Sequence, residues 1–335
     1  MEKRVLLIDD EASLRRTVTM GLMQAGYQTE PCENGMKGLQ ALETYRRKSM
    51  PLDCAIVDIR LPDIDGLKLL KVIKFNYPGL PVIIITGHGN EATVEEVRNQ
   101  KADGYLEKPF TMEELASLLD EVKLPDENPE PVETTREAPV PRQSASTYAL
   151  VTIDASANLL SVYRKLYFLE NVLYCDAVKG EYDLALLLQA DSQDRIQEVV
   201  DREIKTIKGV KDVALLDVET PLFGENVIDI IGSVDHALGR DKGEDEVYTT
   251  PSPRLRASSY AMLEIEKEKL EAIYPVLYFN DQVVHCDYTN GKYDIVLLMK
   301  GTSFTEIGNT IKTKFKPLDG VLRIKEWPII TLFET

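Results

Sequence analysis

Five polar residues in the first third of the chain have the types and spacing for chemistry on a phosphoryl group. Clustered carboxylates bind a hard divalent cation such as Mg²⁺, which keeps several waters and also takes a phosphoryl oxygen. A lysine beside the metal neutralises charge that builds up on the transferring group. An aspartate can act as the nucleophile, and a threonine hydroxyl can hydrogen-bond the new phosphoryl oxygens. The candidates for these roles are Asp9, Asp10, Asp58, Thr86 and Lys108.

Short apolar strands alternate with helical patterns over residues 1–122, and the polar candidates stand at strand ends. Five strands alternating with five helices predict an α/β domain with a parallel five-stranded sheet covered on both faces. Ligands bind beyond the carboxyl ends of such strands, so the candidates should meet at one edge. The expected strands are 5–9, 29–32, 54–58, 82–86 and 104–108, and the expected helices are 11–25, 35–47, 66–75, 91–100 and 112–122.

Four strings in this region resemble the receiver domain of two-component response regulators, which has a flavodoxin-like (βα)5 fold. The resemblance implies that a histidine kinase phosphorylates Asp58. It also implies that Asp10, Asp58 and the backbone carbonyl of Arg60 bind Mg²⁺ directly, while Asp9 contributes through water. The strings are LIDDE (7–11), VDIRLPDIDG (57–66), IIITGHG (83–89) and YLEKPF (105–110).

The same resemblance assigns roles on the last two strands of the sheet. Thr86, Lys108 and the aromatic Tyr105 would form the switch that responds to the phosphoryl group. Pro109 stands at the position of a cis peptide in the family. All the residues that the chemistry needs are present, so the resemblance predicts a competent receiver.

Two segments interrupt the pattern of strands and helices. Residues 123–147 are rich in Pro, Glu, Thr and Ser and have almost no large apolar residue. Such a segment cannot bury a core and should be an extended linker that leaves the receiver loosely tethered. In the second segment, 224–258, the string NVIDIIGSVDHAL can form a helix and the remainder reads as loop.

The chain after the linker contains an internal duplication. Residues 166–187 align with 277–298 at an offset of 111, with eleven of 22 positions identical. Each copy reads strand, helix, strand, glycine turn, strand, helix, strand, which is the ferredoxin-like βαββαβ order of an α+β domain. A period of this length indicates a duplicated domain. The expected domains are therefore a receiver (1–122), a linker (123–147), repeat 1 (148–223), a connecting segment (224–258) and repeat 2 (259–335).

Both copies resemble the ligand-sensing RAM domain of the Lrp/AsnC regulators, through the hairpins GEYDLALLL and GKYDIVLLM. The usual N-terminal helix-turn-helix of that family is absent, and the receiver stands in its place. The resemblance implies an amino-acid-like ligand near the hairpins. A structural role competes with this interpretation: Gly for the turn, Tyr for packing and Asp for capping. The candidate ligand residues are Gly180, Tyr182, Asp183, Gly291, Tyr293 and Asp294.

We expect the two repeats to pair with each other inside one chain. A βαββαβ sheet has helices on one face only, so its other face must be covered. Joining two dimerising domains in one chain favours the internal pair. A swapped homodimer is the competing arrangement. The residues assigned to the paired faces are Leu184, Leu186 and Leu188 in repeat 1, and Ile295, Leu297 and Met299 in repeat 2.

Composition narrows the class of function. The net charge is −17 without a dense basic stretch, which disfavours DNA binding. No apolar run reaches the roughly 18 residues of a membrane helix. The four cysteines form no CxxC pair, so we expect reduced, buried thiols and a cytoplasmic protein.

The sequence therefore predicts a response regulator whose output is a non-DNA-binding pair of RAM-like domains. That output would act through protein association and a small ligand. A transcriptional regulator that contacts DNA through an unrecognised basic surface is the alternative. An enzyme in the repeats is a third option, but they offer neither a nucleophile beside a base nor a metal-ligand spacing, so we expect no enzyme.

Overall fold

A computed structural model describes most of the chain. The described residues are 3–48, 50–87, 97, 101–122, 145–221, 223, 225–238, 257–330 and 332. The predicted helix at 91–100, apart from residue 97, lies outside them, as do most of the predicted linker and the loop of the connecting segment. The chain divides into two compact units, Met1–Thr135 with Phe223–Asp245, and Arg136–Leu222 with Glu246–Thr335.

The first unit is built on a parallel five-stranded sheet with the order β2-β1-β3-β4-β5. The α/β prediction is confirmed, and the strand bounds differ from the expected ones by at most two residues. Its central strands are apolar and buried on both faces, which is usual for a sheet covered by helices on both sides. The strands are β1 (Lys3–Ile8), β2 (Tyr27–Cys32), β3 (Cys54–Asp58), β4 (Val82–Thr86) and β5 (Gly104–Glu107).

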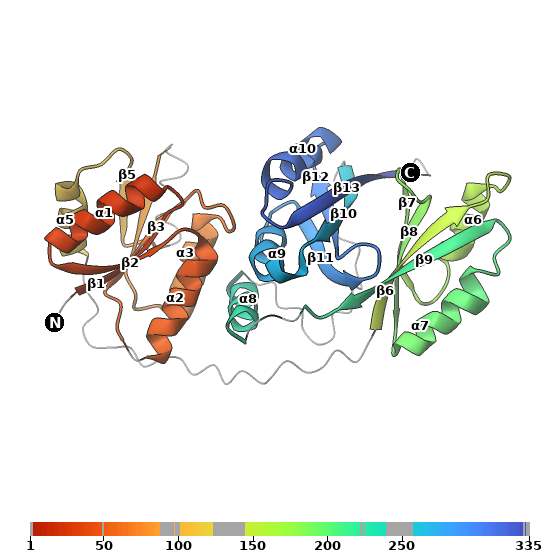
Figure 1. Ribbon diagram of the computed structural model, residues 1–335, viewed down its shortest axis with the longest axis horizontal. Helices are drawn as coiled ribbons and strands as arrows, with labels where there is room; N and C mark the ends of the chain where they lie inside the picture. The colour runs from red at the N-terminus through yellow and green to blue at the C-terminus, as the bar shows by residue number, and fades with distance from the viewer. Residues whose placement is uncertain are drawn as a thin grey trace. The chain divides into compact units, whose positions relative to one another are not determined.

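Helices cover both faces of this sheet, with α1 and α5 on one side and α2 and α3 on the other (Figure 1). Local side-chain caps fix where α2 and α5 begin. The Asn34 side chain accepts a hydrogen bond from the third residue of α2, and Thr111 and Glu114 form a capping box at α5. The helices are α1 (Ala12–Gln24), α2 (Gly35–Arg47), α3 (Gly66–Asn76) and α5 (Met112–Glu121).

A further helix of this unit comes from the segment between the two repeats. The helix α8 (Glu225–Leu238) packs on α2 and α3. Its presence was predicted from the sequence, but its place on the first unit was not.

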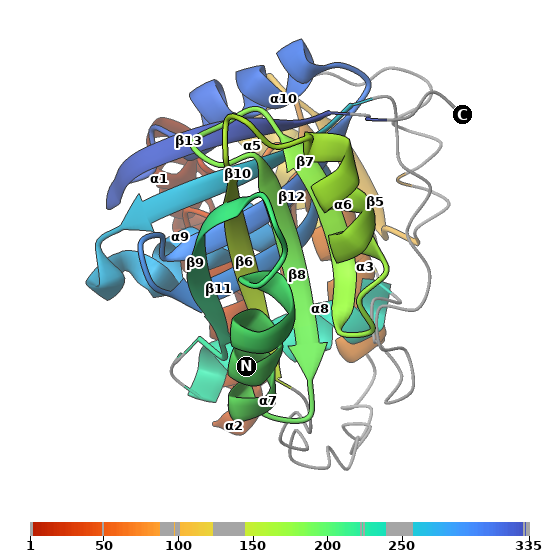
Figure 2. The ribbon, with the colours of Figure 1, turned by 90° about the vertical axis from the view of Figure 1, so that its right-hand side faces the viewer.

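The second unit is a closed eight-stranded barrel with helices on the outside (Figure 2). Each repeat contributes four antiparallel strands in the predicted βαββαβ order. Repeat 1 consists of β6 (Ala145–Ile153), α6 (Leu159–Tyr167), β7 (Val172–Val178), β8 (Leu184–Ala190), α7 (Gln193–Val199) and β9 (Val210–Glu219). Repeat 2 consists of β10 (Ala257–Ile265), α9 (Leu270–Tyr278), β11 (Val283–Asn290), β12 (Ile295–Gly301), α10 (Phe304–Thr310) and β13 (Val321–Ile330).

The two repeats are joined at both edges of their sheets. Strand β9 pairs with β11, and β7 pairs with β13, so the barrel closes within one chain, as expected. The two repeats begin slightly earlier than expected, at Ala145 and Ala257, so the last three residues assigned to the linker belong to β6.

The faces of the paired strands are the reverse of our expectation. Leu184, Leu186 and Leu188 pack against the helices of repeat 1, in one core with Val162 and Ile196. The alternate residues point into the barrel. Because both faces of these strands are apolar, period-two alternation could not tell the barrel face from the helix face. In the barrel interior lie Tyr148, Leu150, Ala185, Leu187, Leu216, Tyr260, Met262, Tyr293, Val296 and Trp327.

Two reciprocal hydrogen bonds cross the barrel between equivalent positions of the repeats. The Tyr148 hydroxyl donates to Asp287 at 2.6 Å, and the Tyr260 hydroxyl donates to Asp176 at 2.9 Å. All four residues are buried. A buried carboxylate needs such donors, so these bonds favour this alignment of the two repeats.

An ion cluster joins the repeats at the outer surface. The Glu181 carboxylate of repeat 1 accepts hydrogen bonds from Lys292 and the Tyr293 hydroxyl, each at 2.8 Å, and pairs with Lys325. Hydrogen bonds from Lys292 and then from Lys325 lower the pKa of Glu181 to about 2. Its carboxylate therefore remains ionised throughout the physiological range.

Removing one hydroxyl from the barrel should destabilise the second unit. The variant Tyr148→Phe removes the hydroxyl that donates to the buried Asp287, and this loss costs about 1–3 kcal/mol in the free energy of unfolding. Trp327 is the chain's only tryptophan and lies in the barrel, so its fluorescence during urea unfolding follows this unit alone. The control Tyr167→Phe, at an exposed position, should leave the midpoint unchanged. Equal midpoints for both variants would contradict the role of the Tyr148 bond.

Candidate functional site

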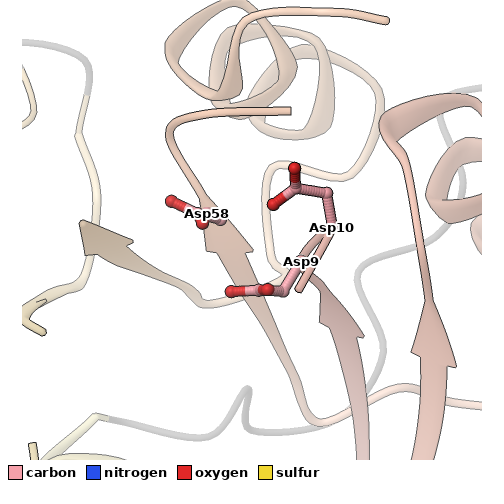
Figure 3. A group of neighbouring side chains, drawn as sticks. All are labelled: Asp9, Asp10 and Asp58. Carbon is pink, nitrogen blue, oxygen red and sulfur yellow. The ribbon is translucent and has the colours of Figure 1, made fainter. Parts of the chain in front are cut away.

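Three aspartates meet at the carboxyl edge of the parallel sheet (Figure 3). Asp9 and Asp10 directly follow β1, and Asp58 is the last residue of β3. One carboxylate oxygen from each lies within 4.8 Å of the others. Asp9 and Asp58 are buried and Asp10 is exposed. The structure therefore brings together the three acidic residues selected from the sequence.

Lys108 joins the two buried carboxylates. Its Nζ atom lies 2.7 Å from Oδ2 of Asp9 and 2.5 Å from Oδ2 of Asp58. The lysine follows β5, and its backbone N–H donates to the carbonyl of Thr86 at the end of β4. The peptide bond between Lys108 and Pro109 is cis, as predicted.

Burial and ion pairing act in opposite directions on these groups. Burial raises the pKa of Asp9 above its usual value, although hydrogen bonds from Lys108 and from the backbone of Glu11 oppose this. Burial lowers the pKa of Lys108, but the hydrogen bonds with Asp58 and Asp9 outweigh it, and the pKa is raised. The lysine is thus held in its charged form beside the carboxylates.

The donor set suits a hard divalent cation. Three carboxylates against one ammonium leave the cluster negative when all are ionised, and oxygen is the ligand atom that Mg²⁺ prefers. Asp10 and Asp58 would hold the ion, which would supply positive charge to the oxygens of a phosphoryl group. The backbone N–H of Arg60 donates to Asp58 at 3.2 Å; metal binding by the Arg60 carbonyl stays a prediction.

The loop from Asp58 to α3 is held by residues that we did not single out from the sequence. A Cβ atom on Gly66 would lie 2.2 Å from the Asp58 carbonyl oxygen, so only glycine allows α3 to start so close to β3. The buried Asp63 carboxylate accepts hydrogen bonds from the backbone N–H groups of Gly35 and Met36, at 2.9 and 2.7 Å. The available signal was the string DIDG, in which acidic residues precede a glycine at a helix start.

Two of the predicted switch residues, Thr86 and Tyr105, lie on the neighbouring strands β4 and β5, and the third, Lys108, follows β5. Thr86 is 2% exposed. The hydroxyl of Tyr105 is buried and has no hydrogen-bond partner among the residues that the structure describes. Burial, and then the charge of Glu107, raises the pKa of Tyr105. Their role in switching stays a prediction.

The hairpin aspartates anchor backbone inside their own repeats. The Asp183 carboxylate accepts from the N–H of Ile153 at 2.7 Å, and the Asp294 carboxylate accepts from the N–H of Ile265 at 2.9 Å. Both carboxylates therefore have a structural role, and ligand binding by them stays a prediction.

The hairpin glycines allow a close approach inside the barrel. A Cβ atom on Gly180 would lie 2.4 Å from the ring of Trp327, and one on Gly291 would lie 2.7 Å from Leu216. Gly291 also has a φ of +152°. Tyr293 is buried against Trp327, and Tyr182 packs on the same indole.

Comparison with known families agrees with this geometry. Residues 5–120 match the family model described as the response regulator receiver domain. The first unit contains a receiver domain. Residues 146–216 match the model described as the Lrp/AsnC ligand binding domain, so the domain that follows the receiver, repeat 1, is of that kind. Repeat 2 has the same fold as repeat 1 and is related to it by the internal sequence repeat.

Known relatives resemble this chain over the receiver. An NtrX-like response regulator of Rickettsia felis is 38% identical over 117 residues, which is 34% of this chain and 24% of that protein. The DNA-binding transcriptional regulator NtrC of Escherichia coli is 39% identical over 116 residues, 35% of this chain and 24% of that protein. The chain thus spans about a quarter of the length of these two relatives.

A solved structure shows the same coverage. The CheY-like receiver domain protein from Methanospirillum hungatei is 28% identical, covering 36% of this chain and 93% of its own, with a TM-score of 0.34.

Within the described part of the chain, no helix has both the length and the apolar character to cross a membrane.

Removing the lysine charge should make the receiver's stability depend more strongly on Mg²⁺ than in the parent. The variant Lys108→Met leaves Asp9 and Asp58 buried without a counter-charge, and breaking a buried pair costs about 3–5 kcal/mol. We expect thermal melting, followed by circular dichroism, to occur at lower temperature and to recover with Mg²⁺, which neutralises the same carboxylates. The control Lys37→Met, which removes an exposed pair with Glu33, should melt like the parent. A Lys108→Met melting curve that is indifferent to Mg²⁺ would contradict the assignment.

Proposed function

We propose that the protein is a response regulator that accepts a phosphoryl group from a histidine kinase on Asp58. The supporting observation is the placement of Lys108 on both Asp9 and Asp58, at the edge where the three carboxylates gather. That arrangement supplies a nucleophile, a cation site and a fixed positive charge at one point. The family match over residues 5–120 supports the same assignment.

The proposed reaction uses groups that the structure brings together. A carboxylate oxygen of Asp58 forms the new bond to phosphorus while the bond from phosphorus to the histidine nitrogen of the kinase breaks. The histidine nitrogen keeps the electron pair of that bond. Lys108 remains protonated and faces the side where negative charge develops, as its raised pKa favours.

We further propose that the repeats are an output module that acts by protein association, without a separate catalytic activity. Support comes from the barrel, which is closed and filled with side chains, and from the acidic character of the chain. The name of NtrC describes that protein as DNA-binding. Its similarity to this chain lies in the receiver, so the name says nothing of the repeats. The proposal includes a cytoplasmic location, which the four buried cysteine thiols support.

Ligand sensing is the second candidate, because repeat 1 matches a ligand binding domain. Trp327 contacts the hairpin residues Tyr182 and Tyr293, so a ligand bound there should change its emission. We expect amino acids at millimolar concentration to shift this fluorescence and to raise the melting temperature by mass action. An unchanged spectrum with every amino acid and small carboxylate tested would remove this candidate.

The phosphoacceptor can be tested directly. With acetyl phosphate and Mg²⁺, the parent should acquire one phosphoryl group that hydroxylamine removes, as expected for an acyl phosphate, measured by intact-protein mass spectrometry. The variant Asp58→Ala should acquire none, because it lacks the nucleophile. The control Glu121→Ala removes an exposed carboxylate at the end of α5, away from the loop, and should be labelled normally. Undiminished labelling of Asp58→Ala would refute the assignment.

A further inference from the structure

The helix α8 lies between the two repeats in sequence but belongs to the receiver unit in structure. Strand β9 of repeat 1 ends at Glu219, and α8 begins at Glu225. Repeat 2 begins at Ala257, after the helix. The chain thus leaves repeat 1, packs on α2 and α3 of the receiver unit and then enters repeat 2.

The contact has the character of specific packing. Val227, Ile230, Val234 and Ala237 follow the spacing of one helix face, and each is at most 5% exposed. At the end of α3, the ring of Phe75 makes an edge contact with the ring of His236, with centroids 4.9 Å apart. Burial of an apolar stripe stabilises such docking.

The two helices that support α8 are both anchored to the phosphoacceptor loop. Helix α3 starts at Gly66, whose backbone N–H donates to the Ile59 carbonyl at 2.8 Å and which lies against the carbonyl of Asp58. Helix α2 starts at Gly35, where Asp63 of the same loop accepts its N–H. The loop is therefore in direct contact with the first residue of each of the two helices that support α8.

We propose that α8 is the output element of the receiver, and that phosphorylation of Asp58 weakens its docking on α2 and α3. The inference rests on the proposed function. In the unphosphorylated form, the Asp58 carboxylate pairs with Lys108 and accepts a hydrogen bond from the backbone N–H of Arg60. In this form α8 is docked on α2 and α3. A phosphoryl group on Asp58 must share these donors and the space beside the loop, so the loop and the starts of α2 and α3 shift.

The position of α8 in the sequence gives its release a consequence. Docked, it ties the connection between the repeats to the receiver. Released, it exposes its own apolar stripe to a partner protein. Allosteric coupling between two sites in a protein is typically about 5- to 150-fold in an equilibrium constant.

Hydrogen exchange of the α8 amides in the full chain tests the proposal. In Mg²⁺, beryllofluoride, which mimics the phosphoryl group, should accelerate exchange of α8 by about 5- to 150-fold, through the shifted docking equilibrium. In the Asp58→Ala variant, beryllofluoride should leave the exchange rate of the α8 amides unchanged. The variants Val234→Asp and His236→Ser should show fast exchange in α8 without beryllofluoride. The increase should be larger for Val234→Asp, which places a carboxylate in the buried stripe. The exposed-site control Lys71→Ser on α3 should match the parent.

The outcomes separate this proposal from the proposed function. If Asp58 is labelled by acetyl phosphate but α8 exchange is unchanged by beryllofluoride, the α8 proposal is wrong and the function stands. If Asp58 takes no phosphoryl group, both are wrong. A double variant, Phe75→Cys with His236→Cys, treated with a short bismaleimide, should cross-link within one chain. A product that is mainly a covalent dimer would overturn docking of α8 within its own chain.

Discussion

The second unit depends on one constraint: each repeat has helices on one face of its sheet, and the opposite face is apolar. Water must be excluded from both open faces, and closure into one barrel does this while pairing the sheet edges. The hairpin details follow. Glycines at 180 and 291 permit close packing inside the barrel, and the Trp327 ring fills it. The crossed tyrosine–aspartate bonds satisfy the polar groups that closure buries.

The barrel buries apolar faces, whereas the receiver buries charged groups at its functional site. Its sheet edge removes two carboxylates from water and pairs both with a single lysine, which leaves a net negative charge for an incoming cation. The same edge holds the loop on which α2 and α3 begin. Chemistry and mechanical connection thus share one short stretch of backbone, between Asp58 and Gly66.

The sequence was sufficient for the parts that depend on chain order and residue type. The alternation of strands and helices predicted a parallel sheet, with Asp9, Asp58 and Lys108 at the carboxyl edge of its strands. The internal repeat predicted two paired domains. It was insufficient where several solutions share one pattern. Strands that are apolar on both faces do not reveal which face meets the helices, so Leu184, Leu186 and Leu188 were assigned to the wrong side. An amphipathic helix such as α8 carries no sign of its partner. Asp63 and Gly66 act through backbone contacts, and the string DIDG signalled only a helix start at this point, not those contacts.

The ion cluster around Glu181 has a consequence for how copies of this chain recognise one another. Glu181 and Lys292 occupy equivalent positions of the duplication, at an offset of 111, and they pair with each other. An isologous pair of first repeats would place glutamate opposite glutamate, and an isologous pair of second repeats would place lysine opposite lysine. Opposite charges at this equivalent position therefore favour pairing of each repeat with its non-identical counterpart over pairing with a second copy of itself.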